Sequence, residues 1–225
     1  WEGVYTSFDE VPASGEKFDG SRWVEASEAK ALELQGTAKN QGTVPAAVSY
    51  NASLLPFMAA VIAGELGKVT ILDFGGGLGL DYLRVISAIP DSHSVRCHIV
   101  ENSSICEAGE RIFADDSRVE FHTSIPEDLQ TVNIVHLGSS LHYINDWRAA
   151  VQKLTDYRPQ YVLFTDLIAG DIPTYVTGQN YYGSTIPCWF FNIGEIVDAL
   201  SDAGFNLIFK SIFDATILGK QQDLP

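Results

Sequence analysis

Apolar residues along the chain follow two patterns. Short runs rich in β-branched residues predict buried strands, and the amphipathic stretches between them predict helices. We expect strands at residues 69–74, 95–101, 119–124, 132–138, 161–167 and 206–213. We expect helices at residues 45–66, 80–88, 103–113, 146–157 and 193–205. This alternation predicts an α/β fold with a mostly parallel sheet and helices on both faces.

Local signals mark some of the helix ends. Gly67 is suited to end the helix at 45–66, Ser103 or Ser104 to cap the helix at 103–113, and Asp146 to cap the helix at 146–157. In sheets of this kind, ligands bind beyond the carboxyl ends of the strands. The segments that follow four of the strands are therefore the places to look for a binding site.

Two segments show no clear periodicity of apolar residues. Residues 1–44 read as an N-terminal arm, with a helix near 27–34 and with aromatic residues that pack on a main domain at 45–225. Residues 174–191, "TYVTGQNYYGSTIPCWFF", read as a long loop that is rich in aromatic and amide groups. Loops of this length are often binding loops, although a packed loop without a ligand is the alternative.

Composition narrows the class of protein. The 225 residues are 46% apolar and 19% charged, which is typical of a globular domain, and no apolar run reaches the about 20 residues that cross a bilayer. The net charge of −15 argues against binding to nucleic acid or anionic lipid. Three cysteines without a CxxC pair indicate a reducing compartment, so we expect a cytoplasmic protein. Because the chain begins at Trp1, a trimmed chain and one domain of a longer protein both stay open.

A run of glycines, "VTILDFGGGLG", follows the strand at 69–74. It does not fit a P-loop, because no Gly-Lys-Ser or Gly-Lys-Thr follows. It does not fit the dinucleotide pattern G-x-G-x-x-G either, because the third glycine would fall on Leu80 or Tyr82. What remains is an acid followed by three alternate glycines, and a second acid, Glu101, ends the next strand.

This pattern resembles the first motif of class I S-adenosylmethionine-dependent methyltransferases, with Glu101 placed to accept hydrogen bonds from both ribose hydroxyls. The resemblance implies a Rossmann-like fold with a sheet of the seven-stranded type, S-adenosylmethionine as cofactor and S-adenosylhomocysteine as product. It implies cofactor contacts from Asp73, Gly75, Gly76, Gly77, Gly79, Glu101, Asn102, His122, Thr123, Gly138 and Ser139. The alternative is that the glycines serve only tight packing and that Glu101 is an ordinary strand end.

A narrower resemblance covers nearly the whole chain. The segments "WEGVYTSFDEV", "KFDGSRW", "LDFGGGLG", "LGSSLHYINDW" and "YYGSTIP" resemble a family of methyltransferases often encoded in bacterial lipopolysaccharide and surface-polysaccharide regions. That family implies O-methylation of a sugar or surface-glycan precursor, and a place in a larger polysaccharide-assembly protein or complex.

An alcohol acceptor benefits from a general base, and His142, just after the strand at 132–138, is the first candidate. Asp166 is the second, as a base partner or a substrate ligand, and either residue could instead cap a local turn. The substrate contacts that we expect are Ser140, Tyr143, Gln179, Asn180, Tyr181 and Tyr182. We expect no metal, since Asp166, Asp171 and Asn180 lack clear ligand spacing. We also expect His136, inside an apolar strand, to be a core residue.

Two other functions stay open. One is a methyltransferase fold without catalysis that acts as a binding or scaffold module. The other is a nucleotide-sugar oxidoreductase or epimerase, which the broken dinucleotide pattern and the lack of a Tyr-x-x-x-Lys pair disfavour.

Overall fold

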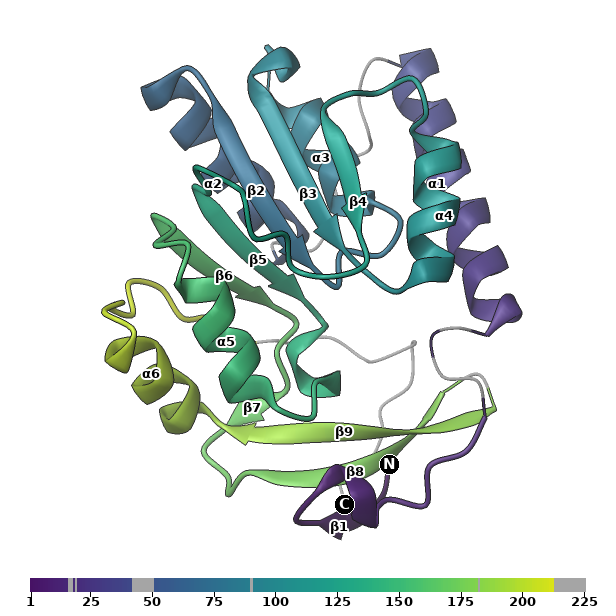
Figure 1. Ribbon diagram of the computed structural model, residues 1–225, viewed down its shortest axis with the longest axis vertical. Helices are drawn as coiled ribbons and strands as arrows, with labels where there is room; N and C mark the ends of the chain where they lie inside the picture. Colours follow the sequence, from purple (N-terminus) through teal and green to yellow (C-terminus); the bar gives the residue numbers. More distant parts are fainter. Residues whose placement is uncertain (16–17, 19, 42–50, 90, 182, 213–225) are drawn as a thin grey trace.

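Five parallel strands form the main sheet of the protein in a computed structural model that describes residues 1–15, 18, 20–41, 51–89, 91–181 and 183–212 (Figure 1). The strands lie in the order β4-β3-β2-β5-β6. Their bounds are β2 (Val69–Phe74), β3 (Val95–Val100), β4 (Val119–His122), β5 (Ile134–Gly138) and β6 (Tyr161–Thr165). Because β2 is the first of them in the chain, the strand order reverses between β2 and β5. A ligand site in such a sheet is expected at this switch point.

Helices cover both faces of the main sheet, as the sequence predicts. Helices α2 (Asn51–Leu66) and α3 (Leu80–Ala88) lie on one face, and α5 (Trp147–Thr155) and α6 (Ile193–Asp202) on the other (Figure 1). Side chains of β2 alternate between these layers, since Ile71 packs with α2 and α3 while Leu72 packs with α5. Helix α4 (Ser103–Ile112) lies beside β4 and contacts α1 (Ser21–Gln41).

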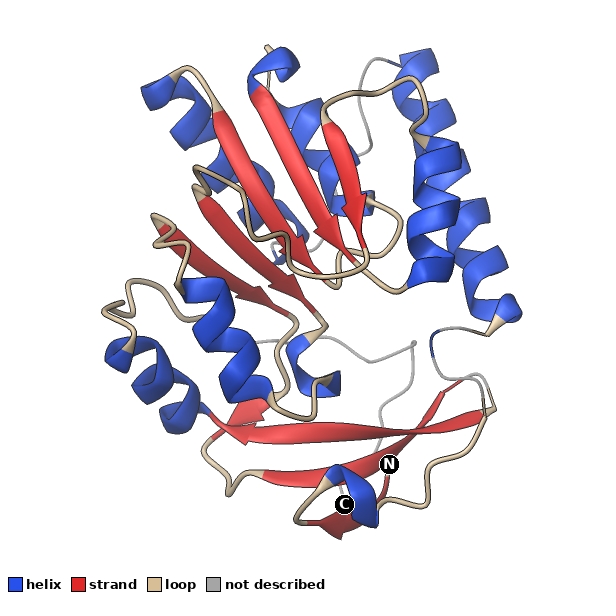
Figure 2. Ribbon diagram, viewed as in Figure 1, coloured by secondary structure: helices blue, strands red, loops and turns tan. Residues whose placement is uncertain are grey.

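A second sheet lies across from the carboxyl ends of the parallel strands (Figure 2). It has the order β1-β8-β9-β7 and consists of β1 (Glu2–Tyr5), β7 (Ala169–Gly170), β8 (Tyr175–Tyr181) and β9 (Ser184–Asn192). Strand β8 pairs along its whole length with residues 184–190 of β9 in antiparallel fashion, and the last two residues of β9 pair with β7. The loop expected at 174–191 is therefore wrong. Ile186, Cys188 and Phe190 share one face of β9 and are buried, and Pro187 and Phe191 on the other face are buried as well.

The N-terminal residues are more regular than the sequence indicates. Strand β1 pairs with β8, residues Phe8–Glu10 form a 3-10 turn, and α1 extends over 21 residues instead of the short helix expected near 27–34. Helix α2 begins at Asn51 in the described residues, and positions 45–50 of the expected helix, with the expected boundary at 44, lie outside them.

Two further expectations are wrong. Residues 206–212 do not form the expected last strand, and Leu207, Ile208 and Phe209 are exposed there. The parallel sheet has five strands in the described chain, so the seven strands that the resemblance implies are not confirmed. The cap of α4 is Asn102 and not a serine, because the Asn102 side chain accepts a hydrogen bond from the Ile105 N–H. Across the described ranges, none of the helices combines the length and apolar character that crossing a bilayer requires.

Candidate functional site

The glycine loop between β2 and α3 lies at the switch point of the main sheet. The backbone of Gly75 has φ of +72°, and a Cβ there would overlap the side chain of Ser140, which follows β5. The Ser140 hydroxyl donates to the Phe74 carbonyl at 2.7 Å. Gly77 has φ of +55°, and a Cβ there would point into open space. Packing therefore explains the glycine at position 75, whereas it does not explain the glycine at position 77.

A buried polar group supports the loop from below. Asp73, at the end of β2, and His136, on β5, are each 1% exposed, and their Oδ1 and Nδ1 atoms lie 2.8 Å apart. The other ring nitrogen of His136 lies 2.9 Å from the Thr165 hydroxyl. Burial alone would lower the pKa of His136, but the Asp73 carboxylate outweighs it and raises that pKa. His136 is thus a core residue, as expected, and Asp73 lies beneath the loop, where a Cβ on Gly76 would overlap its carboxylate.

Glu101 follows β3 and lies against the glycine loop. Its Oε1 accepts a hydrogen bond from the Gly77 N–H at 3.1 Å, and its Oε2 accepts one from the Asn102 N–H at 2.9 Å. Backbone hydrogen bonds from Gly75 to Val100 and from Glu101 to His122 join the ends of β2, β3 and β4. The predicted cofactor acid and the predicted glycines therefore form one surface, and Asn102 contributes to it while also capping α4.

The remaining predicted cofactor residues lie at neighbouring strand ends. Thr123 is exposed after β4, and the ring of His122 lies against His98, with 3.1 Å between the nearest ring nitrogens. Ser139 follows Gly138 at the end of β5, has φ of +52° and donates its N–H to the Thr165 carbonyl at 2.9 Å. The topology thus brings all of these positions to the carboxyl edge of the sheet.

His142 lies in the 3-10 turn η4 (Leu141–Tyr143), which contacts β9. It is 1% exposed, and its Nδ1 has no hydrogen-bond partner among the residues that the structure describes. Burial lowers the pKa of His142 to about 4, because the charged imidazolium loses its hydration there. The imidazole is therefore neutral at physiological pH and has one buried nitrogen that can accept a proton.

Two predicted substrate residues, one from the turn η4 and one from the second sheet, form a hydrogen bond with each other. The hydroxyl of Tyr143, in η4, donates to the side-chain oxygen of Gln179, in β8, at 2.7 Å. The ring of Phe18 packs on Tyr143 with centroids 4.7 Å apart, and on Tyr181 at 5.9 Å. Beside these rings is a pocket of about 370 Å³ lined by Phe8, Asp9, Phe18, Tyr143, Asn145, Ile186 and Pro187. This volume lies in the range of about 300–1,000 Å³ that is usual for small-molecule sites.

Other predicted residues do not join this group. Asn180 lies on the opposite face of β8 from Gln179, because side chains alternate along a strand, and its amide donates to the Glu2 carboxylate at 2.8 Å. Tyr182 lies outside the described residues. Asp166 is exposed just after β6 with φ of +54°. Within the described chain, neither Asp166 nor Asp171 belongs to a group of three potential metal ligands.

Sequence reasoning missed the pocket residues Ile186 and Pro187, which it assigned to a loop. The aromatic residues of the arm were expected to pack on the main domain, and two of them, Phe8 and Phe18, line the pocket. The signal that could have found Ile186 is the two-residue period of β9, which places it on the face that carries Gln179. The contact between Asp73 and His136 could not be predicted from local sequence, since the two residues are far apart in the chain.

No family model and no curated protein matches this chain. Solved structures do match. A Haloferax volcanii methyltransferase in complex with the Trm112 methyltransferase activator is 17% identical over 89% of this chain and 80% of that one, with a TM-score of 0.53. An O-methyltransferase family protein from Burkholderia thailandensis is 16% identical over 87% of this chain, with a TM-score of 0.53, and this chain spans 58% of its length.

A third match is CalS10 from Micromonospora echinaspora, an amino pentose methyltransferase of calicheamicin biosynthesis solved with S-adenosylmethionine bound. It is 13% identical over 70% of this chain and 84% of that one, with a TM-score of 0.50. At these identities the likeness concerns the fold. The chain thus has a mixed α/β fold with a five-stranded parallel sheet, which it shares with these solved methyltransferases.

Proposed function

We propose that this protein is an S-adenosylmethionine-dependent methyltransferase that methylates a hydroxyl group of a sugar or surface-glycan precursor. The observation that carries the proposal is the contact between Gly77 and Glu101 at the switch point. An open backbone position with positive φ and a strand-end carboxylate lie within one hydrogen bond of each other. This is the arrangement that a methionine moiety and an adjacent ribose diol require.

The residues present fit that cofactor. Glu101 would hold the ribose hydroxyls, Gly77 would let the backbone approach the methionine part, and Asp73 would keep the loop in shape from below. When bound, S-adenosylmethionine supplies an activated methyl group and its own leaving group. The protein has then to orient the acceptor and remove a proton.

The acceptor side is supported by the pocket beside Tyr143. Aromatic rings and an amide line it or lie next to it, and these groups suit the C–H faces and hydroxyls of a sugar. The three cysteines are free and buried thiols, which fits a reducing compartment such as the cytoplasm. The solved neighbours include an O-methyltransferase family protein and an amino pentose methyltransferase, so a hydroxyl and an amine are the two acceptor classes to compare.

His142 remains our candidate for the base. It is neutral at physiological pH and its Nδ1 is unpartnered among the described residues, so it can accept a hydroxyl proton. Its low pKa makes it a weaker base than an ordinary histidine. We therefore expect the rate with wild-type protein not to fall between about pH 7.5 and pH 6 on account of His142, and His142→Gln to lower kcat by at least about 100-fold. An unchanged kcat in His142→Gln, with a loss in Asp166→Asn, would transfer the role to Asp166.

Calorimetric titration with S-adenosylhomocysteine tests the cofactor assignment. We expect micromolar binding to the wild-type chain, no binding of NAD, and an affinity at least about tenfold lower in Glu101→Gln, because a charge-assisted pair of hydrogen bonds is lost. Glu107→Gln, an exposed position on α4, is the matched control and should bind as the wild type does. A thermal melt of each variant separates loss of binding from loss of folding.

The results of these binding and activity assays distinguish the alternative functions. Binding of NAD in place of S-adenosylhomocysteine would overturn the proposal in favour of an oxidoreductase. Binding of S-adenosylhomocysteine without turnover on hydroxylated or amino sugars would favour the scaffold function. Turnover on amino sugars alone would keep the methyltransferase and reject the hydroxyl acceptor.

A further inference from the structure

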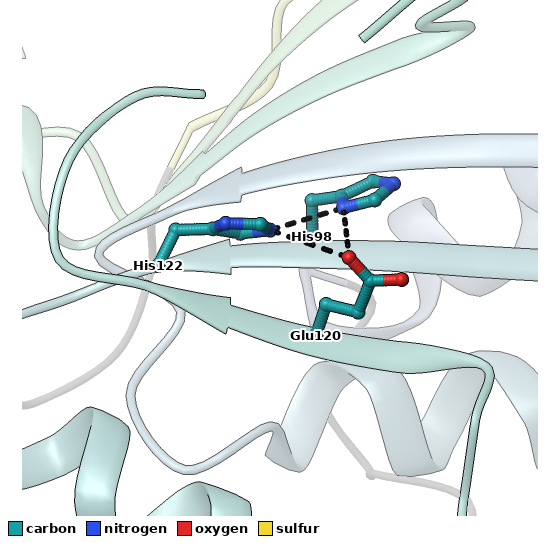
Figure 3. A group of neighbouring side chains, drawn as sticks. All are labelled: His98, Glu120 and His122. Carbon is teal, nitrogen blue, oxygen red and sulfur yellow. Dashed lines mark hydrogen bonds and ion pairs between the residues drawn. The ribbon is translucent and has the colours of Figure 1, made fainter. Parts of the chain in front are cut away.

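Two histidines and a glutamate come together on the face of the main sheet at strands β3 and β4 (Figure 3). Strand pairing explains the cluster. His98 is the direct partner of Glu120 in the parallel register, and His122 is two residues beyond Glu120. Because side chains two residues apart on a strand share a face, all three point to the same side. The cluster is therefore built by two rigid strands and not by a loop.

The distances between the three ligand atoms are those of a metal site. Nδ1 of His98 lies 3.1 Å from Nε2 of His122 and 3.6 Å from Oε2 of Glu120, and the latter two atoms lie 3.9 Å apart. A tetrahedral zinc ion with bonds of about 2.0–2.2 Å has ligand atoms about 3.3–3.6 Å from one another. The three distances between the ligand atoms extend slightly below and slightly above this range. An ion can therefore bind after side-chain shifts of a few tenths of an ångström.

We propose that His98, Glu120 and His122 bind a zinc-class divalent transition-metal ion. Two imidazoles and one carboxylate are a donor set for zinc, whereas magnesium and calcium prefer oxygen ligands alone. Three protein ligands leave a fourth position to water, and the Glu120 side chain is 59% exposed, so the ion has a route of entry. The proton now shared between the two rings moves to the other nitrogen of its ring, so both rings bind in the neutral form.

The bound ion joins β4, an edge strand, to β3 at the rim of the candidate cofactor site. The carbonyl of His122 accepts the backbone N–H of Glu101 at 2.9 Å, so the cross-link lies one hydrogen bond from the predicted cofactor acid. A structural ion here would hold the end of β4 in register. This inference does not rest on the proposed function, since it concerns the strands themselves.

A second group of potential ligands, Asp73, Asp81 and His136, is a poorer candidate for a metal site. Asp73 and His136 already share a direct 2.8 Å contact and are each 1% exposed, so an ion would have to displace that contact inside the core. The prediction of no metal from the sequence considered Asp166, Asp171 and Asn180 and did not weigh His98. Helix α4 separates the two strands in the sequence, so spacing alone does not reveal the cluster.

Zinc binding to untagged protein that has been stripped with a chelator tests the proposal. Competition with a chromophoric chelator should give one zinc ion per chain, and cobalt substituted for zinc should show the intense visible absorption of tetrahedral coordination. His98→Ala and His122→Ala should each lower zinc affinity at least about 100-fold, and Glu120→Gln about tenfold. His93→Gln, in the turn η3 (Ser92–Ser94) outside the cluster, is the matched control and should bind zinc as the wild type does.

Each variant is checked by circular dichroism, and Glu120→Gln, at an exposed position, keeps the test valid if a histidine variant misfolds. Zinc should raise the melting temperature of the wild type and of His93→Gln but not of His98→Ala. No zinc bound at micromolar concentration would overturn the proposal. So would binding that persists unchanged in folded His98→Ala and Glu120→Gln, which would place the ion elsewhere.

Discussion

The buried imidazole of His142 should make the stability of this protein fall as the pH falls. Its pKa is lowered from 6.5 to about 4 in the folded protein because the ring is buried. Between these values the unfolded chain binds a proton at this position and the folded chain does not, so the free energy of unfolding decreases with falling pH. The full difference corresponds to about 3 kcal/mol, and about 2 kcal/mol of it is lost by about pH 5.

The substitution His142→Leu removes this term without adding a buried polar group. Its Nδ1 has no partner among the described residues, so little hydrogen bonding is lost, and near pH 7.5 the variant should be within about 1.5 kcal/mol of the wild type. Urea unfolding at several pH values gives the difference between the two curves, in which contributions from His136 and the carboxylates cancel. That difference should move by about 2 kcal/mol towards the variant between pH 7.5 and pH 5.

The variant His93→Gln, at an exposed position, is the control and should show no such movement. A flat difference curve for His142→Leu, with both proteins fully folded at pH 5, would refute the reasoning. It would mean that the imidazole is hydrated or finds a partner when charged.

Three further substitutions test the site and its supports. Gly77→Ala should cost about 1 kcal/mol of stability, because of the positive φ, but should lower S-adenosylhomocysteine affinity at least tenfold in calorimetry; unchanged affinity would mean that the open position is not where the ligand lies. Tyr143→Phe should lower the free energy of unfolding in urea by about 1–2 kcal/mol, since it leaves the buried Gln179 oxygen without its donor, and Tyr143→Phe combined with Gln179→Leu should recover part of that loss. Asn102→Ala should cost about 1 kcal/mol in the same assay while Ser103→Ala costs little; equal costs would contradict the assignment of the α4 cap.

The main sheet is the part of the fold that sequence patterns predict well. The strand at 69–74 and the helix at 80–88 have the predicted bounds, because short buried parallel strands and amphipathic helices each leave a local signature. That the glycine loop and Glu101 lie side by side could be predicted for a related reason. The ends of neighbouring parallel strands meet at one edge of the sheet, so two chain positions one β-α-β unit apart are brought together by topology.

The second sheet could not be predicted in the same way. Strand β1 pairs with β8, which lies more than half the chain away, and local patterning carries no information about that partner. Buried polar residues in β8, such as Gln179, obscure the alternation of apolar and polar residues that marks a strand. The Gln179 side chain is buried, and its oxygen accepts a hydrogen bond from Tyr143. The apolar residues 207–209 were expected to form part of a strand, but in the described chain they pair with neither sheet, so a strand-like composition alone did not determine the structure here.

The pocket beside Tyr143 is formed by segments that lie far apart in the sequence. The candidate cofactor surface comes from one continuous block between β2 and η4, whereas the pocket combines Tyr143 and Asn145 with Phe8 and Phe18 near the N-terminus and with Ile186 and Pro187 of β9. Strand β1 and the β8–β9 hairpin are hydrogen-bonded to each other, so these two wall segments form one unit. A chimaera intended to transfer acceptor preference must therefore exchange residues 1–18 and 169–192 together, along with Tyr143 and Asn145, while the glycine loop can stay in place.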